Sequence, residues 1–273
     1  MSASAMLSRV NELPKIPKVL QELVEMVNQE EVDLMQLSKK ISMEQVVSAR
    51  ILRMSNSAHF GRSRTIASVD EAVIRLGVEP IRTLLVVSVL VSAFPKVKGL
   101  DMSVYWNDTF EIATIASNVA KKAGLDGNQA FTAGMLHNIG ELMIHTLAEE
   151  EAMQIVQRVE KGEEKISAQS DVLGITAPEL GAKLAVAWKF APQLVDSIEH
   201  YLEPEKAEKD PKMATALHFA YEVNQKWDDF EDEDKTSFVD SNDDVRRLAL
   251  SNDIVGVLDE ARGQGRSMAE QIV

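Results

Sequence analysis

The sequence contains no cysteine, which excludes disulfide bonds, zinc–thiolate sites, iron–sulfur clusters and cysteine nucleophiles. Aromatic residues make up only 5% of the chain, within a hydrophobic content of 45% that is mostly aliphatic. That composition favours helices packed on helices over a β-sandwich. The longest apolar run, TLLVVSVLVSAF at 83–94, falls well short of the roughly 20 residues that span a bilayer, so it indicates a buried helix.

Positive charge is also scarce, since 29 Lys and Arg stand against 43 Asp and Glu and the formal net charge is −14. A protein this acidic repels nucleic acid and anionic membranes unless it carries a local basic patch. The N-terminal residues MSASAMLSRV are too short and too broken for a signal peptide. We therefore expect a cytoplasmic protein that binds neither nucleic acid nor membrane.

Apolar residues recur at helical spacing along almost the whole chain, and no segment alternates like a strand. The predicted helices include 103–123 and a continuous helix at about 128–148. The segment PKVKGLDMS, 95–103, interrupts the pattern with a proline, a glycine and charges. The sequence predicts an all-α protein with an N-terminal helical part, 1–95, and a second helical part, 96–273.

Residues 228–244 hold nine acidic residues and one lysine, which is a net charge of −8. A calcium loop needs oxygen ligands at alternate positions and a glycine at its sixth position, and this segment contains no glycine. We interpret it as a solvated acidic loop.

A candidate metal site lies around MLHNIGEL, 135–142. On one continuous helix over 131–148, His137, Glu141 and His145 fall within about 80° of one another. Asp108 faces them if the helix at 103–123 packs antiparallel to this one. A cluster of imidazole and carboxylate groups suits a divalent transition metal, which can activate water for phosphoester hydrolysis. Spacing alone favours the alternative, a hydrogen-bonded core histidine beside a surface glutamate.

Four segments together carry a resemblance to a known family. They are LPKIPKVLQELVEMV at 13–27, the stretch from DLMQLSKKIS to SVDEAVIRLG at 33–77, FTAGMLHNIGELMI at 131–144, and ELGAKLAVAWKFAPQLVDSIEHY at 179–201. They resemble the HDOD family, a branch of the HD-domain phosphohydrolase superfamily, over roughly residues 13–220. The resemblance implies a bacterial signal-transduction protein in which an N-terminal helical part precedes an HD-like helical bundle.

The superfamily's hydrolases bind metal through a His, a His-Asp pair on the next helix, further histidines in some branches, and a late Asp. The resemblance places these roles, in chain order, at Asp108, His137 with Asn138, Ala177, His200 and, for the late Asp, near Ala220–Tyr221. Asn138 lacks the charge of the pair's acid, and Ala177 has no ligating atom. The resemblance therefore implies a vestigial site that holds no catalytic residue, metal or cofactor.

Two functions follow as hypotheses. The first is a non-catalytic module that binds protein partners in signalling, with a degenerate HD metal site. The alternative is a metal-dependent phosphohydrolase that acts on nucleotides or other phosphoesters and holds a divalent transition metal. In the first case, His137 and Asp108 either pair to keep two helices in register or belong to a pocket for a small anion. Glu141, His145 and Ala177 would then add to the pocket lining.

The segment SNSAHFGRSRT, 55–65, is a second candidate for a contact. It joins two apolar helices and therefore predicts an exposed loop. Its polar side chains are those of Asn56, His59, Arg62 and Arg64. Two arginines do not make a nucleic-acid surface in so acidic a chain, so we interpret the segment as a protein-interaction loop, with solvated loop arginines as the alternative.

Overall fold

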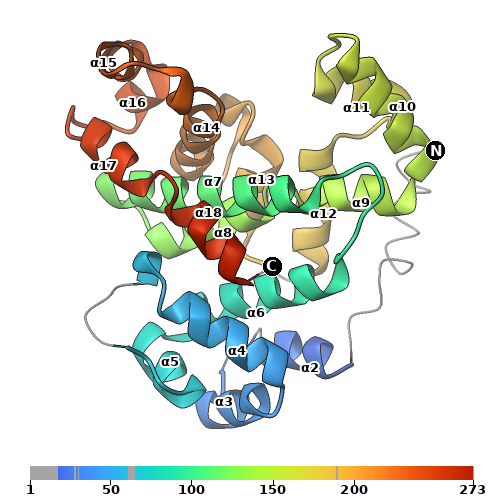
Figure 1. The fold of residues 1–273 in the computed structure, drawn as a ribbon, viewed down its shortest axis with the longest axis vertical. Helices are drawn as coiled ribbons and strands as arrows, with labels where there is room; N and C mark the ends of the chain where they lie inside the picture. The colour runs from blue at the N-terminus through green and yellow to red at the C-terminus, as the bar shows by residue number, and fades with distance from the viewer. Residues whose placement is uncertain (1–17, 28, 30, 61–64, 189, 273) are drawn as a thin grey trace. The chain divides into compact units, whose positions relative to one another are not determined.

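The computed structural model describes residues 18–272 apart from 28, 30, 61–64 and 189, and in this part of the chain it contains helices and no strand (Figure 1). The prediction of an all-α protein is confirmed. The chain divides into two compact units, described here one at a time. Within the described residues, the N-terminal unit comprises 18–95 and 266–272, and the bundle unit comprises 96–265. The division after Pro95 lies where the sequence breaks, whereas the sequence assigned 266–273 to the second part.

The N-terminal unit contains α2 (Lys18–Val27), α3 (Leu34–Ser42), α4 (Gln45–Ser55), η2 (Ala58–Phe60), α5 (Val69–Leu76), α6 (Val78–Ala93) and most of α18 (Gln264–Ile272). Local signals set several of these ends. The Asp33 carboxylate accepts hydrogen bonds from the backbone N–H groups of Met35 and Gln36, each at 3.0 Å, and so caps α3. The Ser68 hydroxyl accepts from the N–H of Glu71 at 3.1 Å and caps α5. The apolar run at 83–94 supplies most of the buried side chains of α6, which also buries Ile81.

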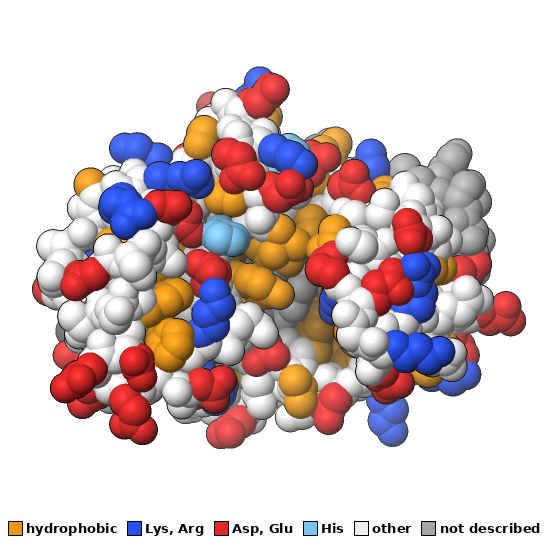
Figure 2. Space-filling view, turned by 90° about the horizontal axis from the view of Figure 1, so that it is seen from above, with side chains coloured by type: hydrophobic (Ala, Val, Ile, Leu, Met, Phe, Trp, Pro, Cys, Tyr) orange, Lys and Arg blue, Asp and Glu red, His pale blue; other side chains and the backbone are white. Residues whose placement is uncertain are grey.

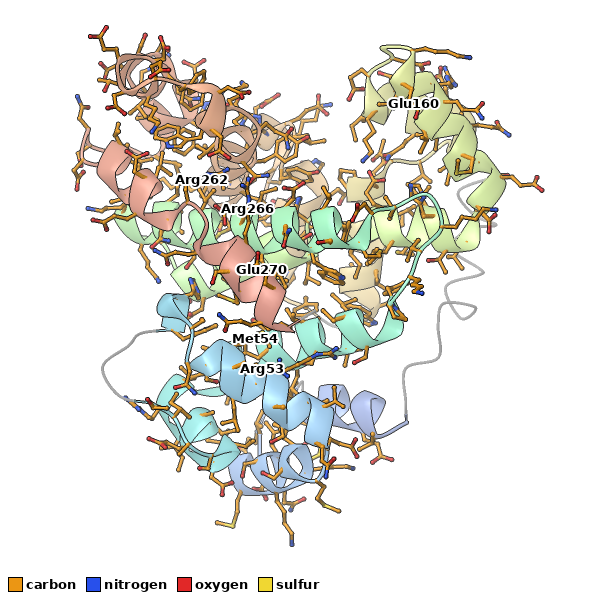
Figure 3. The ribbon with its side chains drawn as sticks, viewed as in Figure 1. Arg53, Met54, Glu160, Arg262, Arg266 and Glu270 are labelled. Atoms are coloured by element: carbon orange, nitrogen blue, oxygen red, sulfur yellow. The ribbon has the colours of Figure 1, made fainter. Side chains whose placement is uncertain are left out.

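The last residues of the chain belong to the N-terminal unit because arginines on α4 hold them. The guanidinium of Arg50 donates to the carbonyls of Ile272, at 3.1 Å, and Ser88, at 3.0 Å. Arg53 donates to the carbonyl of Gln271, beside the end of α18 (Figure 3). The last carbonyls of a helix have no partner within the helix, so these arginines satisfy groups that burial would otherwise leave unpaired.

The bundle unit contains α7 (Met102–Lys122), α8 (Gly127–Leu136), α9 (Ile139–Leu147), α10 (Glu149–Glu160), α11 (Lys165–Leu173), α12 (Ala177–Ala187), α13 (Pro192–His200), η3 (Pro204–Lys206), α14 (Pro211–Lys226), η4 (Trp227–Asp229), α15 (Asp232–Ser241), α16 (Asp243–Arg247) and α17 (Ile254–Ala261). Helix α7 is buried along most of its length and packs against α8, α14 and α17. A Cβ on Gly134 of α8 would lie 2.4 Å from the Cα of Ala113, so this glycine lets α8 approach α7 closely.

The acidic segment 228–244 is largely helical, so its interpretation as a loop is wrong. It forms η4, α15 and the start of α16. Three acidic residues, 232–234, occupy the first turn of α15, where a helix dipole favours negative charge. On the inner face, Phe238 stacks on Phe219 with ring centroids 6.1 Å apart, and Val239 is buried. Packing of these apolar side chains against the rest of the bundle unit stabilises the helix, and the charge pattern of the segment gives no sign of this packing.

Among the helices of the described residues, none combines the length and the apolar character that a membrane span requires.

Candidate functional site

The predicted continuous helix at 128–148 is two helices in the structure. Helix α8 ends at Leu136, and α9 begins at Ile139, so His137 and Asn138 form a turn between them. The turn allows α9 to meet the start of α12 at very short range, since a Cβ on Gly140 would lie 1.9 Å from the carbonyl oxygen of Ala177. His137, Glu141 and His145 therefore do not share one helical face, and the prediction that they do is wrong.

His137 is buried, with 2% of its surface exposed. Its Nδ1 lies 2.6 Å from the carbonyl oxygen of Gly134. Because a carbonyl only accepts, Nδ1 carries the proton, and Nε2 is the free acceptor of a neutral ring. Burial lowers the pKa of His137 to about 4, despite the raising effect of the Gly134 carbonyl. The ring is neutral at pH 7 and packs edge-on against Tyr201, with centroids 5.2 Å apart.

His137 and Asn138 line a cavity of about 800 Å³ within the bundle unit. Asp108, Glu141 and Ala177 also line it, as do Tyr105, Tyr201 and Tyr221, which are all the tyrosines in the chain. Burial raises the pKa of Tyr105 and Tyr201 well above the usual value, so both phenols stay protonated. On the face seen in Figure 2, apolar side chains floor a hollow that charged side chains surround.

The amide of Asn138 is held from both ends. Its Oδ1 accepts from the hydroxyl of Tyr105 at 2.9 Å, and its Nδ2 donates to Oγ1 of Thr109 at 2.7 Å. The Thr109 hydroxyl in turn donates its single proton to the carbonyl of Tyr105 at 2.6 Å. With its proton on this carbonyl, Thr109 Oγ1 accepts from residue 138, and the Nδ2 group of the amide is the donor.

Asp108 lies on α7 and is half-buried at the cavity wall. Its Oδ1 accepts a hydrogen bond from Nδ2 of Asn224 on α14, at 3.4 Å. The imidazole of His137 is bonded to Gly134 instead. The expected direct pair of His137 and Asp108 is therefore not formed, although both residues line the same cavity.

Glu141 is also at the cavity wall, and its charge is paired there. Its Oε1 accepts from the ammonium of Lys165 at 2.9 Å and from the amide of Gln169 at 2.7 Å. The Gln169 carbonyl oxygen then accepts from the backbone N–H of Ala177 at 2.8 Å. This chain of contacts joins α9 to α11 and α12, and it uses the carboxylate that the sequence assigned to a metal or to the surface.

His145 and His200 lie outside the lining of this cavity. His145 is buried, its Nδ1 bonds to the carbonyl of Lys98 at 3.0 Å, and burial lowers its pKa. The side chain of His200 is 28% exposed, and its Nε2 lies 3.9 Å from a carboxylate oxygen of Asp196 on the same helix. The expectation that these two histidines complete the vestigial pocket is wrong in this geometry.

Within the candidate interaction loop, Asn56 has a structural contact. Its Nδ2 donates to the carbonyls of Leu52 and Ile66, at 2.8 and 2.9 Å, and its Oδ1 accepts from the N–H of Ile66 at 2.8 Å. His59 lies in η2 and packs edge-on against Phe60. Arg62 and Arg64 lie outside the described residues, so the interaction role of this loop stays a prediction.

Sequence reasoning missed the three tyrosines and Lys165. Their positions along the chain show no spacing that marks a common site, because they come from α7, α11, the end of α13 and α14. The one signal in the sequence was that tyrosine is rare, with only three in 273 residues. The structure shows that all three line one cavity.

Comparisons with known proteins agree with this fold. The sequence model of the HDOD domain family matches residues 13–204. An uncharacterized protein of Treponema pallidum is 23% identical over 222 residues, which cover 80% of this chain and 43% of that protein. The chain thus spans less than half the length of this curated relative.

Solved structures extend the comparison. The structure named "putative phosphohydrolase" from Shewanella amazonensis is 36% identical, with a TM-score of 0.86 and coverage of 99% of this chain and 98% of that one. An HDOD domain protein of unknown function from Geobacter sulfurreducens is 24% identical, with a TM-score of 0.79 and coverage of 99% and 97%. A "putative signal transduction protein" from Marinobacter aquaeolei is 19% identical, with a TM-score of 0.72 and coverage of 97% and 61%.

Proposed function

Because this chain belongs to the HDOD family, we propose that it is a non-catalytic signal-transduction module whose HD-type site is degenerate and which acts through protein partners. The bonding of Asn138 carries this proposal. At the position that the resemblance gives to the superfamily's acidic ligand, an amide donates to Thr109 and accepts from Tyr105, so both of its polar atoms are bonded within the protein. The position now serves the packing of α9 against α7.

The other donors at the cavity do not fit the superfamily's metal centre either. Ala177 offers no ligand, the Glu141 carboxylate is bonded to Lys165 and Gln169, and His200 lies outside the lining. Among the described residues, the group of three donors with ligand atoms within 4.8 Å of one another lies elsewhere, at His218. A hydrolytic centre needs several anionic or imidazole ligands that converge on one point, and His137 with Asp108 supplies too few.

The charge of the cavity bears on its ligand. Its lining carries one lysine and five carboxylates, at Asp101, Asp108, Glu141, Glu164 and Glu203. A lining with this excess of negative charge opposes the entry of a small anion such as a nucleotide. The cavity therefore supports the expected anionic ligand poorly, and a protein partner is the better candidate.

Exposed apolar side chains support a protein partner. Seven large hydrophobic side chains are exposed among the described residues, and five of them lie in the N-terminal unit, at Leu34, Met35, Met43, Val46 and Ile74. They come from α3 to α5, which pack on one another. Exposed methionine and aliphatic side chains are typical of surfaces that bind other proteins.

Two measurements test the proposal. The first is the metal content of protein purified without chelator, together with a panel of phosphoesters assayed with added manganese, iron, nickel or cobalt. We expect no bound ion that is lost in His137→Ala and no turnover that depends on His137. Hydrolysis by the wild-type chain that is lost in His137→Ala would overturn the proposal.

The second measurement is capture of partners from the native cell by the full chain, followed by mass spectrometry. The double variant Met35→Glu, Val46→Glu should lose the specific partner. Val186→Glu is the matched control, because Val186 is as exposed as Val46, at 60%, but lies in the bundle unit. Equal capture by both variants would contradict an interaction through α3 to α5.

Two observations favour the alternative function, a metal-dependent phosphohydrolase. The protein with which this chain shares 36% identity is named "putative phosphohydrolase", and the Nε2 atom of His137 keeps the protonation state of a metal ligand. The phosphoester panel separates the two functions, since a hydrolase would need a divalent transition metal for turnover.

A further inference from the structure

A second polar cluster lies in the bundle unit, away from the cavity around His137. His218 and Glu222 are four residues apart on α14 and therefore share one helical face. Asp244, in the first turn of α16, faces them. One ligand atom from each of the three residues lies within 4.8 Å of the other two, and within the described part of the chain no other group of three such donors does so.

The contacts in this cluster show carboxylates that attract positive charge. The Nδ1 atom of His218 lies 2.5 Å from Oδ2 of Asp244. Glu222 accepts from the ammonium of Lys226 at 2.6 Å and from the amide of Asn242 at 3.0 Å. Each of the two carboxylates thus already has a nitrogen partner, the imidazole of His218 for Asp244 and the ammonium of Lys226 for Glu222.

The cluster also has room on one side. A cavity of about 350 Å³ adjoins it, and the side chains of His218 and Glu222 are 24% and 22% exposed. Asp244 is the anchored member, with 5% of its side chain exposed. Ligands on the protein side and open space on the other side allow a bound ion to keep water in its remaining positions.

We propose that His218, Glu222 and Asp244 bind one divalent transition-metal ion, of the zinc, cobalt, nickel or manganese class, that links α16 to α14. One imidazole and two carboxylates match the ligand preference of these ions, and the two carboxylates balance the double charge. Calcium and magnesium prefer a shell made wholly of oxygen, so they fit less well. None of the three residues lines the cavity around His137, so the site is independent of the proposed function.

Binding requires two local changes. The Lys226 ammonium must leave Glu222, and its side chain, 47% exposed, can turn into solvent. His218 must also give up the proton of its hydrogen bond to Asp244, because an imidazole binds a metal through a deprotonated ring nitrogen. Asn242 can stay, because its amide bonds the second oxygen of Glu222 and would orient that carboxylate as an outer partner. Lys226 is therefore a competitor of the ion.

The test is equilibrium dialysis of the tag-free full chain, stripped with chelator, against zinc or cobalt chloride, with the bound metal measured by mass spectrometry. We expect one ion per chain and a higher melting temperature in its presence. His218→Ala and Asp244→Asn should each reduce affinity by more than the roughly 10–100-fold that is typical for loss of an outer partner.

Two further variants keep the test decisive. Lys226→Met removes the competing ammonium on an exposed side chain and should bind the ion more tightly than wild type. His200→Ala is the matched control. Like His218, His200 lies near an aspartate, in its case Asp196, but within the described residues it belongs to no group of three donors. This variant should therefore bind the ion like wild type. No bound ion in wild type and Lys226→Met, or equal binding in Asp244→Asn, would overturn the proposal.

Discussion

Two histidines of the bundle unit, His137 and His218, behave in opposite ways. His137 is buried against Tyr201 and the carbonyl of Gly134, and burial lowers its pKa to about 4. His218 is only partly buried and touches the carboxylate of Asp244, whose hydrogen bond and charge outweigh burial and raise its pKa. The residue in the family motif thus has no acidic partner, while the residue outside it has one. The chemistry of a histidine in this protein follows its neighbours, not its motif.

The largest effect expected from this comparison is the contribution of His137 to the pH dependence of the free energy of unfolding. Its pKa is about 4 in the folded chain and 6.5 as the ordinary value, so the unfolded chain binds more protons between these limits. Stability should therefore fall as the pH falls from 6.5 towards 4, by about 3 kcal/mol from this residue. This loss of stability is measured by urea unfolding of wild type and His137→Asn at pH values from 7.5 to 4.5. Parallel pH profiles of the two proteins would contradict the buried neutral ring.

A smaller effect is expected for Asn138→Asp. The new carboxylate cannot donate to Thr109 and is placed in a part-buried position, so we expect a loss of about 2 kcal/mol at pH 7. Asn128→Asp is the control, because Asn128 is exposed in the first turn of α8, where an acid suits the helix dipole. Equal stability of the two variants in urea unfolding would show that the amide of residue 138 is not required.

For His218 the pH dependence of its contribution to stability should have the opposite sign to that of His137. Its folded pKa lies above the ordinary 6.5, so its contribution is fully present below pH 6.5 and is lost as the pH rises through the folded value. With chelator present, the difference in stability between wild type and His218→Asn should be about 1–2 kcal/mol at pH 6 and smaller at pH 9. A difference that grows with pH, as expected for His137, would break the contrast between the two residues.

The smallest changes in stability are expected for substitutions of two lysines, Lys165 and Lys226. Lys165→Met leaves Glu141, whose side chain is 10% exposed, with Gln169 as its remaining donor, so we expect a loss of about 1 kcal/mol. Lys226→Met leaves the more exposed Glu222 bonded to Asn242 and should cost less than about 0.5 kcal/mol. Thermal unfolding at neutral pH without metal measures both, and the reverse order would mean that Glu141 is better solvated than its burial indicates.

The sequence alone determined the helical class and the approximate bounds of α7, predicted at 103–123 and observed at Met102–Lys122. These depend on local signals, such as the 3.6-residue period, which act within a few residues. It also determined the family, through long segments that match the HDOD domain over residues 13–204.

Only the tertiary structure decided the contents of the sites. The turn at His137 lies beside a close approach of Gly140 to Ala177, a residue far away in the sequence, and the pairing of Glu141 with Lys165 joins residues from different helices. The contact of His218 with Asp244 and the helical state of 228–244 likewise depend on packing between segments far apart in the sequence. Local periodicity carries no information on which distant side chains meet, and the pKa of a buried histidine depends on those side chains.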